Sequence, residues 1–465
     1  MPLRQSGSLA IPARAGLRVA GASGRQLSLS EIRPQFDPAV TNVLKAGYGP
    51  RWHEILSSLM LPAALGIRTN MRKTSRAKLA AKLSRRGLVT KEFAELSDML
   101  VAESLPATDL SFDDTPEVVV GRLCGEAVLN GANVFVPGVL SCTPGVRAGS
   151  EVLVTSDVDD LDIVGTAVKR LSGRRVLLGK GEVRLSREAM LSRSVDGVAV
   201  EVTERVVQAP PAVNGLLPAG LAYLQGLAPA GIGHLLDPSV HRAVVDLCAA
   251  PGGKTSHVAA RLCEQSLARE SIVIACDRSK NRLSKVKELA EAWGQDNVVY
   301  CLRGDSAKFP AENGFSPDEL LSRGFDTASV LSRGLRQRAW DAVIADPPCS
   351  ALGLRPRLSH AKCTLQEIQR LAEGQRRMLS AAASLVRPGG LIVYSTCTIT
   401  PQENEQNVAW ALANLDLRLE DASPALGGPA WAGHGIGQAD LHLCRRADPV
   451  GDLAGFFAAV LRKPS

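Results

Sequence analysis

From about residue 208 to its end, the chain alternates short apolar runs with longer stretches of helical pattern. The apolar runs are expected to be strands, at residues 243–247, 272–277, 298–301, 342–346 and 391–394. The stretches expected to be helices fall at residues 254–262, 282–293 and about 365–386. This alternation is typical of a parallel α/β sheet with helices on its faces. It is the strongest constraint on the fold.

The carboxyl ends of these strands carry small or acidic residues, at the edge where open parallel sheets bind ligands. Asp277 and Asp305 end the second and third strands, where a carboxylate typically contacts ribose hydroxyls or a purine edge. A turn without bulky side chains lets a cofactor approach the backbone amides at a helix start. The turn after the first strand comprises Cys248, Ala249, Ala250, Pro251, Gly252, Gly253 and Lys254.

The glycine turn also narrows the choice of cofactor. It matches neither G-x-G-x-x-G nor G-x-x-x-x-G-K-[ST], which disfavours a dinucleotide and a nucleoside triphosphate. Taken alone, such a turn is also compatible with a purely structural loop. Together with two acids at successive strand ends, it favours an adenosine carrier without phosphates. We therefore expect S-adenosyl-L-methionine to bind at this edge.

Two cysteines follow the last two of these strands. Cys349 lies in residues 346–350, Asp-Pro-Pro-Cys-Ser, and Cys397 lies in residues 394–398, Tyr-Ser-Thr-Cys-Thr. Many methyltransferases that act on exocyclic amines carry Tyr or Phe after the two prolines, where it stacks on a flipped base. An amine needs no thiol, whereas C5 of cytosine becomes nucleophilic only after a thiolate adds to C6. The thiols therefore predict methylation of cytosine C5.

The groups beside the thiols have roles in this chemistry and structural alternatives. We expect Asp346 to hydrogen-bond the cytosine edge and to favour the charged ring of the adduct. Lys254 is expected to orient that carboxylate or the base. Alternatively, Cys349 or Cys397 is a buried thiol and Lys254 is a surface charge at a helix start. Spacing alone leaves the two thiols interchangeable.

The first half of the chain has a different pattern of apolar residues. From about residue 36 to 111, apolar positions recur at three and four residues, which predicts a mostly helical region. Within it, residues 71–86 carry many basic side chains and no acid, typical of a helix that tracks phosphates or, alternatively, of a solvated face. From about residue 115 to 206, short β-branched runs between glycine turns predict a small barrel or sandwich.

Charge and composition set broader limits. With 54 basic and 47 acidic residues the net charge is +7, which is compatible with a nucleic-acid partner without proving one. No stretch approaches the roughly 18–20 uninterrupted apolar residues of a membrane span, so we expect a soluble protein that has no membrane partner. The 10 cysteines include no C-x-x-C pair and the histidines lack zinc-ligand spacing, so neither disulfides nor a metal are expected.

The first 30 residues contain arginines and serines and no acid. This bias resembles an organellar transit peptide, and a disordered tail is the alternative. We expect a cytoplasmic location, or a mitochondrion or plastid if the segment is a transit peptide.

The motifs together resemble the Sun-domain (NOL/NOP/Sun) RNA cytosine-5 methyltransferases. The resemblance extends over residues 37–465. It implies that Cys397 is the nucleophile, that Cys349 assists enzyme release, and that residues 248–254, Asp277, Asp305 and Asp346 line the S-adenosyl-L-methionine site. The residues that carry it are 67–70, 246–255, 346–350, 388–390, 394–398, 403–405 and 455–457.

Residues 125–138 resemble a PUA domain, a small RNA-binding barrel. A PUA domain between N-terminal helices and the catalytic sheet is the arrangement of the NSUN branch that methylates the tRNA acceptor stem, where this domain reads the 3′ CCA end. The resemblance implies a monomeric enzyme forming 5-methylcytosine in tRNA. An rRNA substrate and a catalytically silent PUA-type RNA-binding factor are the alternatives. Phe135 stands where a relative carries tyrosine, and the segment 315–340 is longer than the family leads us to expect.

The chain is accordingly predicted to be α/β, with a Rossmann-like methyltransferase domain, an N-terminal helical region and an inserted small β-barrel PUA domain. An imperfect repeat at residues 320–325 and 330–335 is expected to form a surface insertion. The expected divisions are 1–36 for a flexible N-terminal segment, 37–112 for the helical region, 113–207 for the PUA domain and 208–465 for the catalytic domain.

Overall fold

The structure is a computed structural model that describes most of the chain. The segment interpreted as a transit peptide lies almost entirely outside the described residues. Those residues are 26–159, 173–192, 195–211, 213, 215–264, 268–358 and 363–465.

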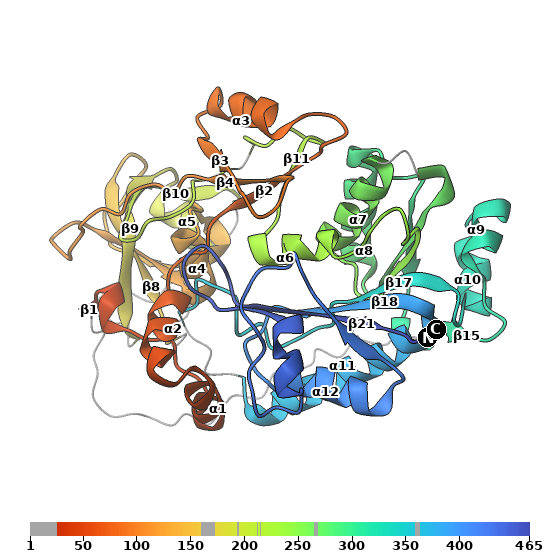
Figure 1. Cartoon of the computed structure of the whole chain (residues 1–465). Helices are drawn as coiled ribbons and strands as arrows, with labels where there is room; N and C mark the ends of the chain where they lie inside the picture. Colours follow the sequence, from red (N-terminus) through yellow and green to blue (C-terminus); the bar gives the residue numbers. More distant parts are fainter. Residues whose placement is uncertain are drawn as a thin grey trace, which may run out of the picture.

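The second half of the chain is built around an eight-stranded sheet (Figure 1). Its main path has the order β14-β13-β12-β17-β18-β21-β19, and β20 pairs with β21. The first five strands of this path run parallel, and the others are antiparallel to their neighbours. The strands are β12 (Ala243–Asp246), β13 (Ile272–Asp277), β14 (Val299–Arg303), β17 (Trp340–Ala345), β18 (Val386–Thr396), β19 (Arg418–Glu420), β20 (Arg445–Ala447) and β21 (Phe456–Arg462).

Helices cover both faces of this sheet, which confirms the predicted Rossmann-like architecture. Adjacent strand residues point to opposite faces, so Val244 packs into one hydrophobic cluster and Val245 into the other. One cluster contains side chains of α7 (Gly253–Glu264) and α8 (Lys280–Trp293). The other contains side chains of α11 (Leu365–Leu385) and α12 (Glu405–Asn414).

The imperfect repeat forms two short helices, α9 (Pro317–Arg323) and α10 (Thr327–Arg333). Each helix ends at a glycine with φ near +81°, a backbone region that disfavours other residues. Leu320 and Val330 pack into the core of the sheet, and most of the remaining repeat positions are exposed or partly exposed. The strands β15 (Pro310–Ala311) and β16 (Leu335–Arg336) join the ends of this insertion.

A second, seven-stranded sheet forms the small β domain that the valine-rich runs predict. Its order is β6-β10-β9-β8-β5-β7, with β1 paired to β9. The helices α4 (Arg122–Leu129) and α5 (Arg187–Ser192) accompany it, and the C-cap of α4 is Asn130. The strands are β1 (Gln26–Leu27), β5 (Glu117–Gly121), β6 (Val134–Phe135), β7 (Val139–Cys142), β8 (Glu151–Asp157), β9 (Arg175–Val183) and β10 (Val198–Arg205).

The prediction of a mostly helical region before this domain is wrong for part of it. Three helices are present, α1 (Pro38–Tyr48), α2 (Trp52–Leu59) and α3 (Arg76–Ser84). Between and after them, short strands form a four-stranded sheet of order β11-β2-β4-β3. Strands of three or four residues carry little periodic signal, and their stability comes from pairing with distant residues. These strands are β2 (Gly66–Thr69), β3 (Thr90–Glu92), β4 (Met99–Ala102) and β11 (Ala222–Leu224).

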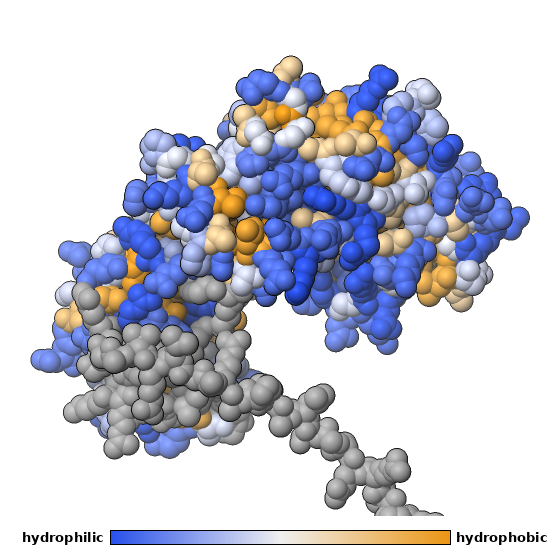
Figure 2. Space-filling model, turned by 90° about the horizontal axis from the view of Figure 1, so that it is seen from below, coloured by the Kyte–Doolittle hydropathy of each residue, from blue (hydrophilic) through white to orange (hydrophobic). Residues whose placement is uncertain are grey.

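Short helices complete the described elements. They are α6 (Leu227–Gly231) and the 3₁₀ helices η1 (Leu29–Glu31), η2 (Gly49–Arg51), η3 (Val136–Gly138), η5 (Ile232–His234), η6 (Ala268–Glu270), η7 (Ser306–Lys308) and η8 (Gln438–Leu443). None of the helices in the described ranges is long and apolar enough to cross a membrane. Figure 2 shows one face of the molecule, on which hydrophilic residues predominate and apolar residues gather in separate groups.

Candidate active site

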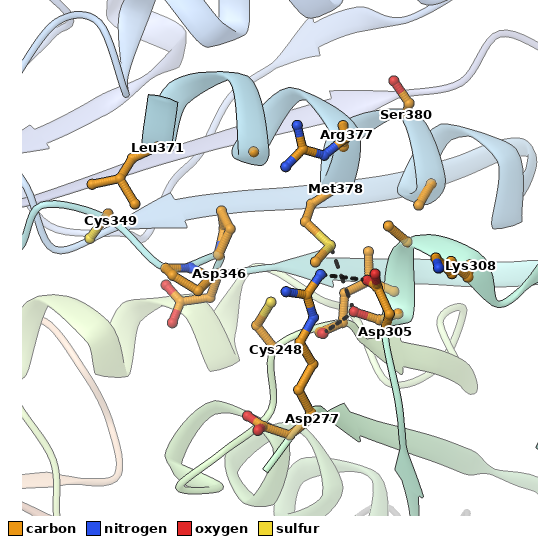
Figure 3. Close-up of a pocket in the computed structure, with 18 of the residues that line it drawn as sticks. Cys248, Asp277, Asp305, Lys308, Asp346, Cys349, Leu371, Arg377, Met378 and Ser380 are labelled. Atoms are coloured by element: carbon orange, nitrogen blue, oxygen red, sulfur yellow. Dashed lines mark hydrogen bonds and ion pairs between the residues drawn. The ribbon is translucent and has the colours of Figure 1, made fainter. Parts of the chain in front are cut away.

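A cavity of about 990 Å³ opens at the carboxyl edge of the eight-stranded sheet (Figure 3). Its walls come from the residues that follow β12, β13, β14, β17 and β18, and from one side of α11. The parallel strands therefore bring together residues that are far apart in the sequence. The predicted site residues among its lining are Cys248, Ala250, Asp277, Asp305, Asp346, Cys349 and Cys397.

The rest of the glycine turn lies behind this lining. Ala249 is buried in the core beside the sheet, and Gly252 adopts φ +109°, which favours glycine. A side chain at Gly253 would bring its Cβ to 3.4 Å from the Tyr223 ring. Pro251 precedes Gly252 in the same turn, and Lys254 points to Asp346 rather than lining the cavity. These residues shape the wall that a cofactor meets.

A buried carboxylate that sequence reasoning missed holds the turn. Asp246 ends β12 and accepts hydrogen bonds from Thr255 Oγ1 at 2.7 Å and from the Cys248 amide at 3.2 Å. Burial raises the pKa of Asp246 to about 6. The available signal is the acid at the strand end, nine positions before a threonine in the first turn of α7. Asp246 thereby fixes both ends of the turn.

Two acids face the same end of the cavity. Asp277 accepts a hydrogen bond from the Ser279 amide at 2.8 Å, and its second oxygen lies 3.6 Å from Arg282. Asp305 forms an ion pair with Arg278 at 2.7 Å. Two carboxylates at adjacent strand ends fit the hydroxyls of a ribose and the amino edge of a purine. The cavity and its donor set therefore fit an adenosine-containing cofactor.

The two predicted thiols are in contact at the other end of the cavity. The Sγ atoms of Cys349 and Cys397 lie 3.3 Å apart. The hydrogen bond from Cys349 lowers the pKa of Cys397, against the effect of burial. The same hydrogen bond, together with burial, raises the pKa of Cys349 well above its usual value. The pair is therefore asymmetric, with Cys397 the better thiolate.

An ion pair lies beside Cys397. Lys254 Nζ donates to Asp346 Oδ2 at 2.6 Å, and Ser395 Oγ donates to Asp346 Oδ1 at 2.7 Å. Burial lowers the pKa of Lys254, but Asp346 outweighs it and the net change is upward, so the ammonium is retained. The Lys254 charge lowers the pKa of Cys397, and the Asp346 charge raises it. Lys254 contacts Asp346 directly, and the role of orienting that carboxylate stays a prediction.

A second buried carboxylate connects the two cysteine loops, and sequence reasoning assigned it no role. Glu403 is fully buried and accepts hydrogen bonds from the Ser350 amide at 2.9 Å and from Thr400 Oγ1 at 2.7 Å. Ser350 Oγ donates to Glu403 at 2.5 Å and also contacts Thr398 Oγ1 at 2.6 Å. Gln375 of α11 donates to Glu403 at 2.9 Å. Glu403 thus ties the residue after Cys349 to the loop after Cys397.

Basic side chains that the sequence did not single out surround the cavity mouth. Arg370 and Arg377 lie on α11, and Lys308 ends η7. All three are exposed. An anionic polymer that enters the cavity would meet these charges first. Their positions on α11 and η7 carry no distinctive motif, so only the folded structure brings them together.

Comparison with known proteins shows to which family the chain belongs. The family described as 16S rRNA methyltransferase RsmB/F matches residues 233–462, and the PUA domain family matches residues 116–206. A human protein named tRNA (cytosine(72)-C(5))-methyltransferase NSUN6 is 35% identical over 72% of this chain and 67% of its own length. A Pyrococcus horikoshii protein named tRNA (cytosine(72)-C(5))-methyltransferase is 32% identical over 85% of this chain and 88% of its own. The chain belongs to the Sun-domain RNA cytosine-5 methyltransferases.

The family membership confirms S-adenosyl-L-methionine as the cofactor and the chain as a methyltransferase. The structure described as NSun6 from Pyrococcus horikoshii with SFG superimposes with a TM-score of 0.73 at 29% identity. It covers 92% of this chain and 99% of that one. The mouse NSUN6 is 35% identical, and the aligned region spans 66% of its length. This chain and the Pyrococcus horikoshii structure thus share one fold over nearly the whole of this chain.

Proposed function

We propose that this RNA cytosine-5 methyltransferase acts on tRNA, at a cytosine of the acceptor stem near the 3′ CCA end, through a covalent adduct between Cys397 and C6 of the base. The contact between Cys397 and Cys349, beside the ion pair of Lys254 and Asp346, is the observation that carries the chemical part. A methyltransferase that acted on an amine would need neither thiol.

The residues of the chain have separate tasks in this reaction. The Cys397 thiolate forms the bond to C6. The electron pair of the C5–C6 double bond then shifts toward C5 and the rest of the ring, so that C5 becomes nucleophilic. Asp346 hydrogen-bonds the polar edge of the cytosine in this proposal, and its contacts with Lys254 and Ser395 support that role. S-adenosyl-L-methionine, when bound, supplies an electrophilic methyl group. Cys349 then assists release, in which C5 loses its proton and the bond from Cys397 to C6 breaks.

The tRNA part of the proposal is supported by the relatives and by the small β domain. Three of the relatives, from mouse, human and Pyrococcus horikoshii, carry names that specify cytosine 72 of tRNA. The PUA match at residues 116–206 adds an RNA-binding domain beside the catalytic one. A protein that combines the two can hold the end of an RNA while the cavity receives a base.

Ribosomal RNA is the second candidate substrate, and a specific relative favours it. An Arabidopsis thaliana protein named rRNA (cytosine-C(5))-methyltransferase NOP2C is 30% identical over 76% of this chain and 74% of its own length. The proposed chemistry does not distinguish the two RNAs, because both contain the same cytosine ring. The choice depends on the surfaces outside the cavity.

The deciding experiment supplies purified protein with methyl-labelled S-adenosyl-L-methionine and one of three RNAs. They are a tRNA transcript, the same transcript without its CCA end, and an rRNA fragment. We expect label in the complete tRNA, located by bisulfite sequencing in the acceptor stem, and a large loss without CCA. Label only in the rRNA fragment would overturn the tRNA proposal, and no label in any RNA would favour a silent RNA-binding factor.

We propose a cytoplasmic location and, as the alternative, a mitochondrion or plastid if residues 1–30 act as a transit peptide. The arginine- and serine-rich composition of that segment supports the alternative. Fluorescent fusions of the full chain and of a chain beginning at residue 31 separate the two. An organellar signal from the full chain that disappears on truncation would favour the transit peptide.

A further inference from the structure

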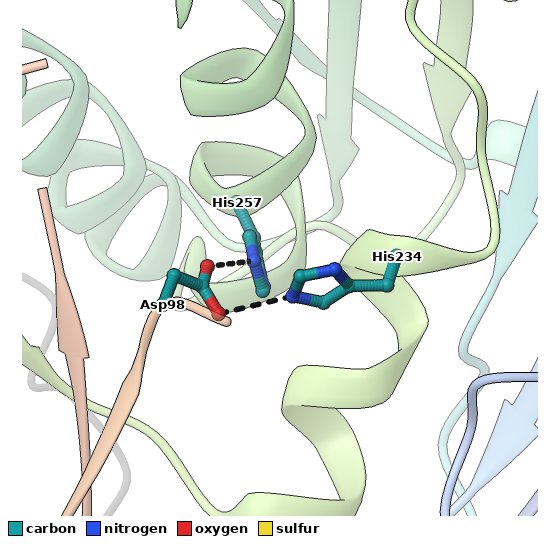
Figure 4. A group of neighbouring side chains, drawn as sticks. All are labelled: Asp98, His234 and His257. Carbon is teal, nitrogen blue, oxygen red and sulfur yellow. Dashed lines mark hydrogen bonds and ion pairs between the residues drawn. The ribbon is translucent and has the colours of Figure 1, made fainter. Parts of the chain in front are cut away.

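A cluster of two imidazoles and a carboxylate lies outside the active-site cavity (Figure 4). Asp98 Oδ2 lies 2.6 Å from His257 Nε2, and Asp98 Oδ1 lies 3.0 Å from His234 Nε2. The two rings are nearly perpendicular, with centroids 5.0 Å apart. The Nε2 atom of each ring faces the same carboxylate, so two imidazole nitrogens and a carboxylate oxygen lie close together.

The members of this cluster come from separate parts of the fold. Asp98 immediately precedes β4 of the four-stranded sheet, His234 ends η5, and His257 lies in α7. Asp98 and His257 are buried and His234 is partly buried. The proposed catalytic chemistry uses none of them. The cluster therefore joins the end of the loop before β4 to η5 and α7 of the catalytic domain.

The chemistry of the three groups is that of a metal site. One atom from each residue can be chosen so that all three lie within 4.8 Å of one another. Two imidazole nitrogens and a carboxylate oxygen are a ligand set that Zn²⁺ accepts, at bond lengths of roughly 2.0–2.2 Å. In the part of the chain that the structure describes, this is the one group with such spacing.

A small cavity next to the cluster provides room for a fourth ligand. It has a volume of about 200 Å³, and Asp98 and His234 line it together with Glu264. Glu264 ends α7, the helix that carries His257. A water molecule or the Glu264 carboxylate can therefore complete a tetrahedral shell. Arg261 also lines this cavity, but its guanidinium donates to the carbonyls of Gly233 and Leu236, both at 2.7 Å.

We propose that Asp98, His234 and His257 bind one Zn²⁺ ion, with the fourth position open to water or Glu264. The ion would connect β4 to α7 and η5. Zinc sites of this kind stabilise the folded chain because the unfolded chain does not preform them.

A residue of β2 connects the N-terminal sheet to the helix that carries His257, close to the cofactor turn. Arg68 is fully buried and donates to Gly253 O at 2.8 Å and to Ser256 Oγ at 2.5 Å, next to His257 on α7. Arg68 thereby holds the first turn of the helix that follows the glycine turn. An ion bound one residue further along would fix the same helix against the same N-terminal sheet.

The test uses the full chain, freed of metal with a chelator and kept reduced. Titration with Zn²⁺ is expected to give one ion per chain at this site and a higher Tm, and Mg²⁺, which prefers oxygen ligands, is expected to give neither. Co²⁺ is the spectroscopic probe, because a site of nitrogen and oxygen ligands gives visible bands without the near-ultraviolet thiolate band that binding to cysteines produces.

His234→Gln is the informative variant, because this side chain is partly exposed and its loss leaves the buried core intact. We expect Zn²⁺ affinity to fall by at least about 10-fold and the Tm increase to disappear. His442→Gln, at an exposed histidine of η8, is the matched control and should bind as the wild type does.

Two results would overturn the proposal. One is wild-type protein whose Tm and Co²⁺ spectrum do not respond to metal, since the contacts of Asp98 would then be hydrogen bonds alone. The other is equal Zn²⁺ affinity in the wild type and in His234→Gln, which would place the ion elsewhere. The wild-type titration decides the question even if the variant fails to fold, and circular dichroism detects that failure.

Discussion

Cys349 and Cys397 touch through their Sγ atoms at 3.3 Å, although 48 positions separate them in the sequence. Cys349 follows β17 and Cys397 follows β18, and these strands are parallel neighbours. Parallel pairing therefore delivers both thiols to the same edge of the sheet. Their pKa values shift in opposite directions, downward for Cys397 and upward for Cys349. The geometry gives two thiols of the same kind different chemistry.

Replacing each thiol in turn tests that division. Cys397→Ala removes the attacking group, so methyl transfer should fall by a factor on the order of 10⁴ or more while RNA and cofactor binding persist. Cys349→Ala leaves attack possible and removes the group that assists release, so a covalent protein–RNA complex should accumulate. Label incorporation and denaturing gels measure the two effects.

Cys124→Ala, in the small β domain, is the matched control for these two variants. It should retain wild-type methyl transfer and form no trapped complex. A covalent complex from Cys397→Ala but none from Cys349→Ala would reverse the assigned roles. If neither Cys397→Ala nor Cys349→Ala forms a covalent complex, the proposal that Cys349 assists release of the adduct is contradicted.

The pH dependence of adduct formation should follow Cys397. Because its pKa is lowered, the thiolate is populated below the pH at which an ordinary cysteine ionises, and activity is lost as the pH falls through that lowered value. Lys254→Met removes a positive charge that lowers this pKa, so the rising limb of the pH–rate profile should move to higher pH. Single-turnover rates across a pH series measure the midpoint.

Lys285→Met, at an exposed lysine of α8, controls for the loss of one positive charge. Its midpoint should coincide with that of the wild type. A Lys254→Met profile that keeps its midpoint and loses only amplitude would mean that the ammonium orients Asp346 without affecting the thiolate.

Glu403 should matter for both stability and rate, because it ties the two cysteine loops together. In Glu403→Gln the new side chain has nearly the same shape, but an NH₂ group replaces one carboxylate oxygen. That group is a hydrogen-bond donor, and it would face the donors that now bind Glu403. Hydrogen bonds to a charged group contribute about 1.5–3 kcal/mol each, so Tm and the adduct-forming rate should both fall. Glu373→Gln, an exposed position on α11, should change neither. Unchanged rates in Glu403→Gln would show that the loops hold their positions without this carboxylate.

The contact between the thiols also predicts sensitivity to hydrogen peroxide. The Cys397 thiolate reduces one peroxide molecule and becomes a sulfenic acid, and the Cys349 thiol then displaces water to form a disulfide. Activity should be lost and then restored by a dithiol reductant. Mass spectrometry should find the linked peptides in the wild type and an oxygenated Cys397 in Cys349→Ala. Oxygenated Cys397 in the wild type, with no linked peptides, would contradict this order.

The elements that carry the catalytic site could be predicted because their signals are local. The strand predicted at residues 243–247 appears as Ala243–Asp246, and the helix at 282–293 as Lys280–Trp293. Long helices and buried parallel strands have strong periodic or apolar patterns. In contrast, β2 depends on pairing with β11, more than 150 positions away, and local patterns do not contain that information.

The same distinction separates the site residues that were predicted from those that were missed. Asp277 ends β13 and Cys397 directly follows β18, so strand positions alone bring them to one edge. Glu403 has its role because Ser350 and Gln375 reach it from other elements, a convergence that exists only in the folded chain. Asp98 and His257 are 159 positions apart, which hides their contact from any search for closely spaced ligands.

The exposed basic face of α3 should contribute to RNA binding outside the cavity. Lys78 and Lys82 are exposed on a segment without acidic residues, whereas α8 carries Glu288 and Glu291 as well as its exposed lysines. The double variant Lys78→Ala and Lys82→Ala should weaken tRNA binding and reduce the slope of log affinity against log salt by about one for each phosphate that is no longer neutralised. Lys285→Ala with Lys287→Ala is the matched control. Lysines that bind phosphates release counterions from the RNA, and this release steepens the salt dependence of binding. Equal slopes in the two double variants would therefore show that the face of α3 is a solvated surface that does not bind phosphates.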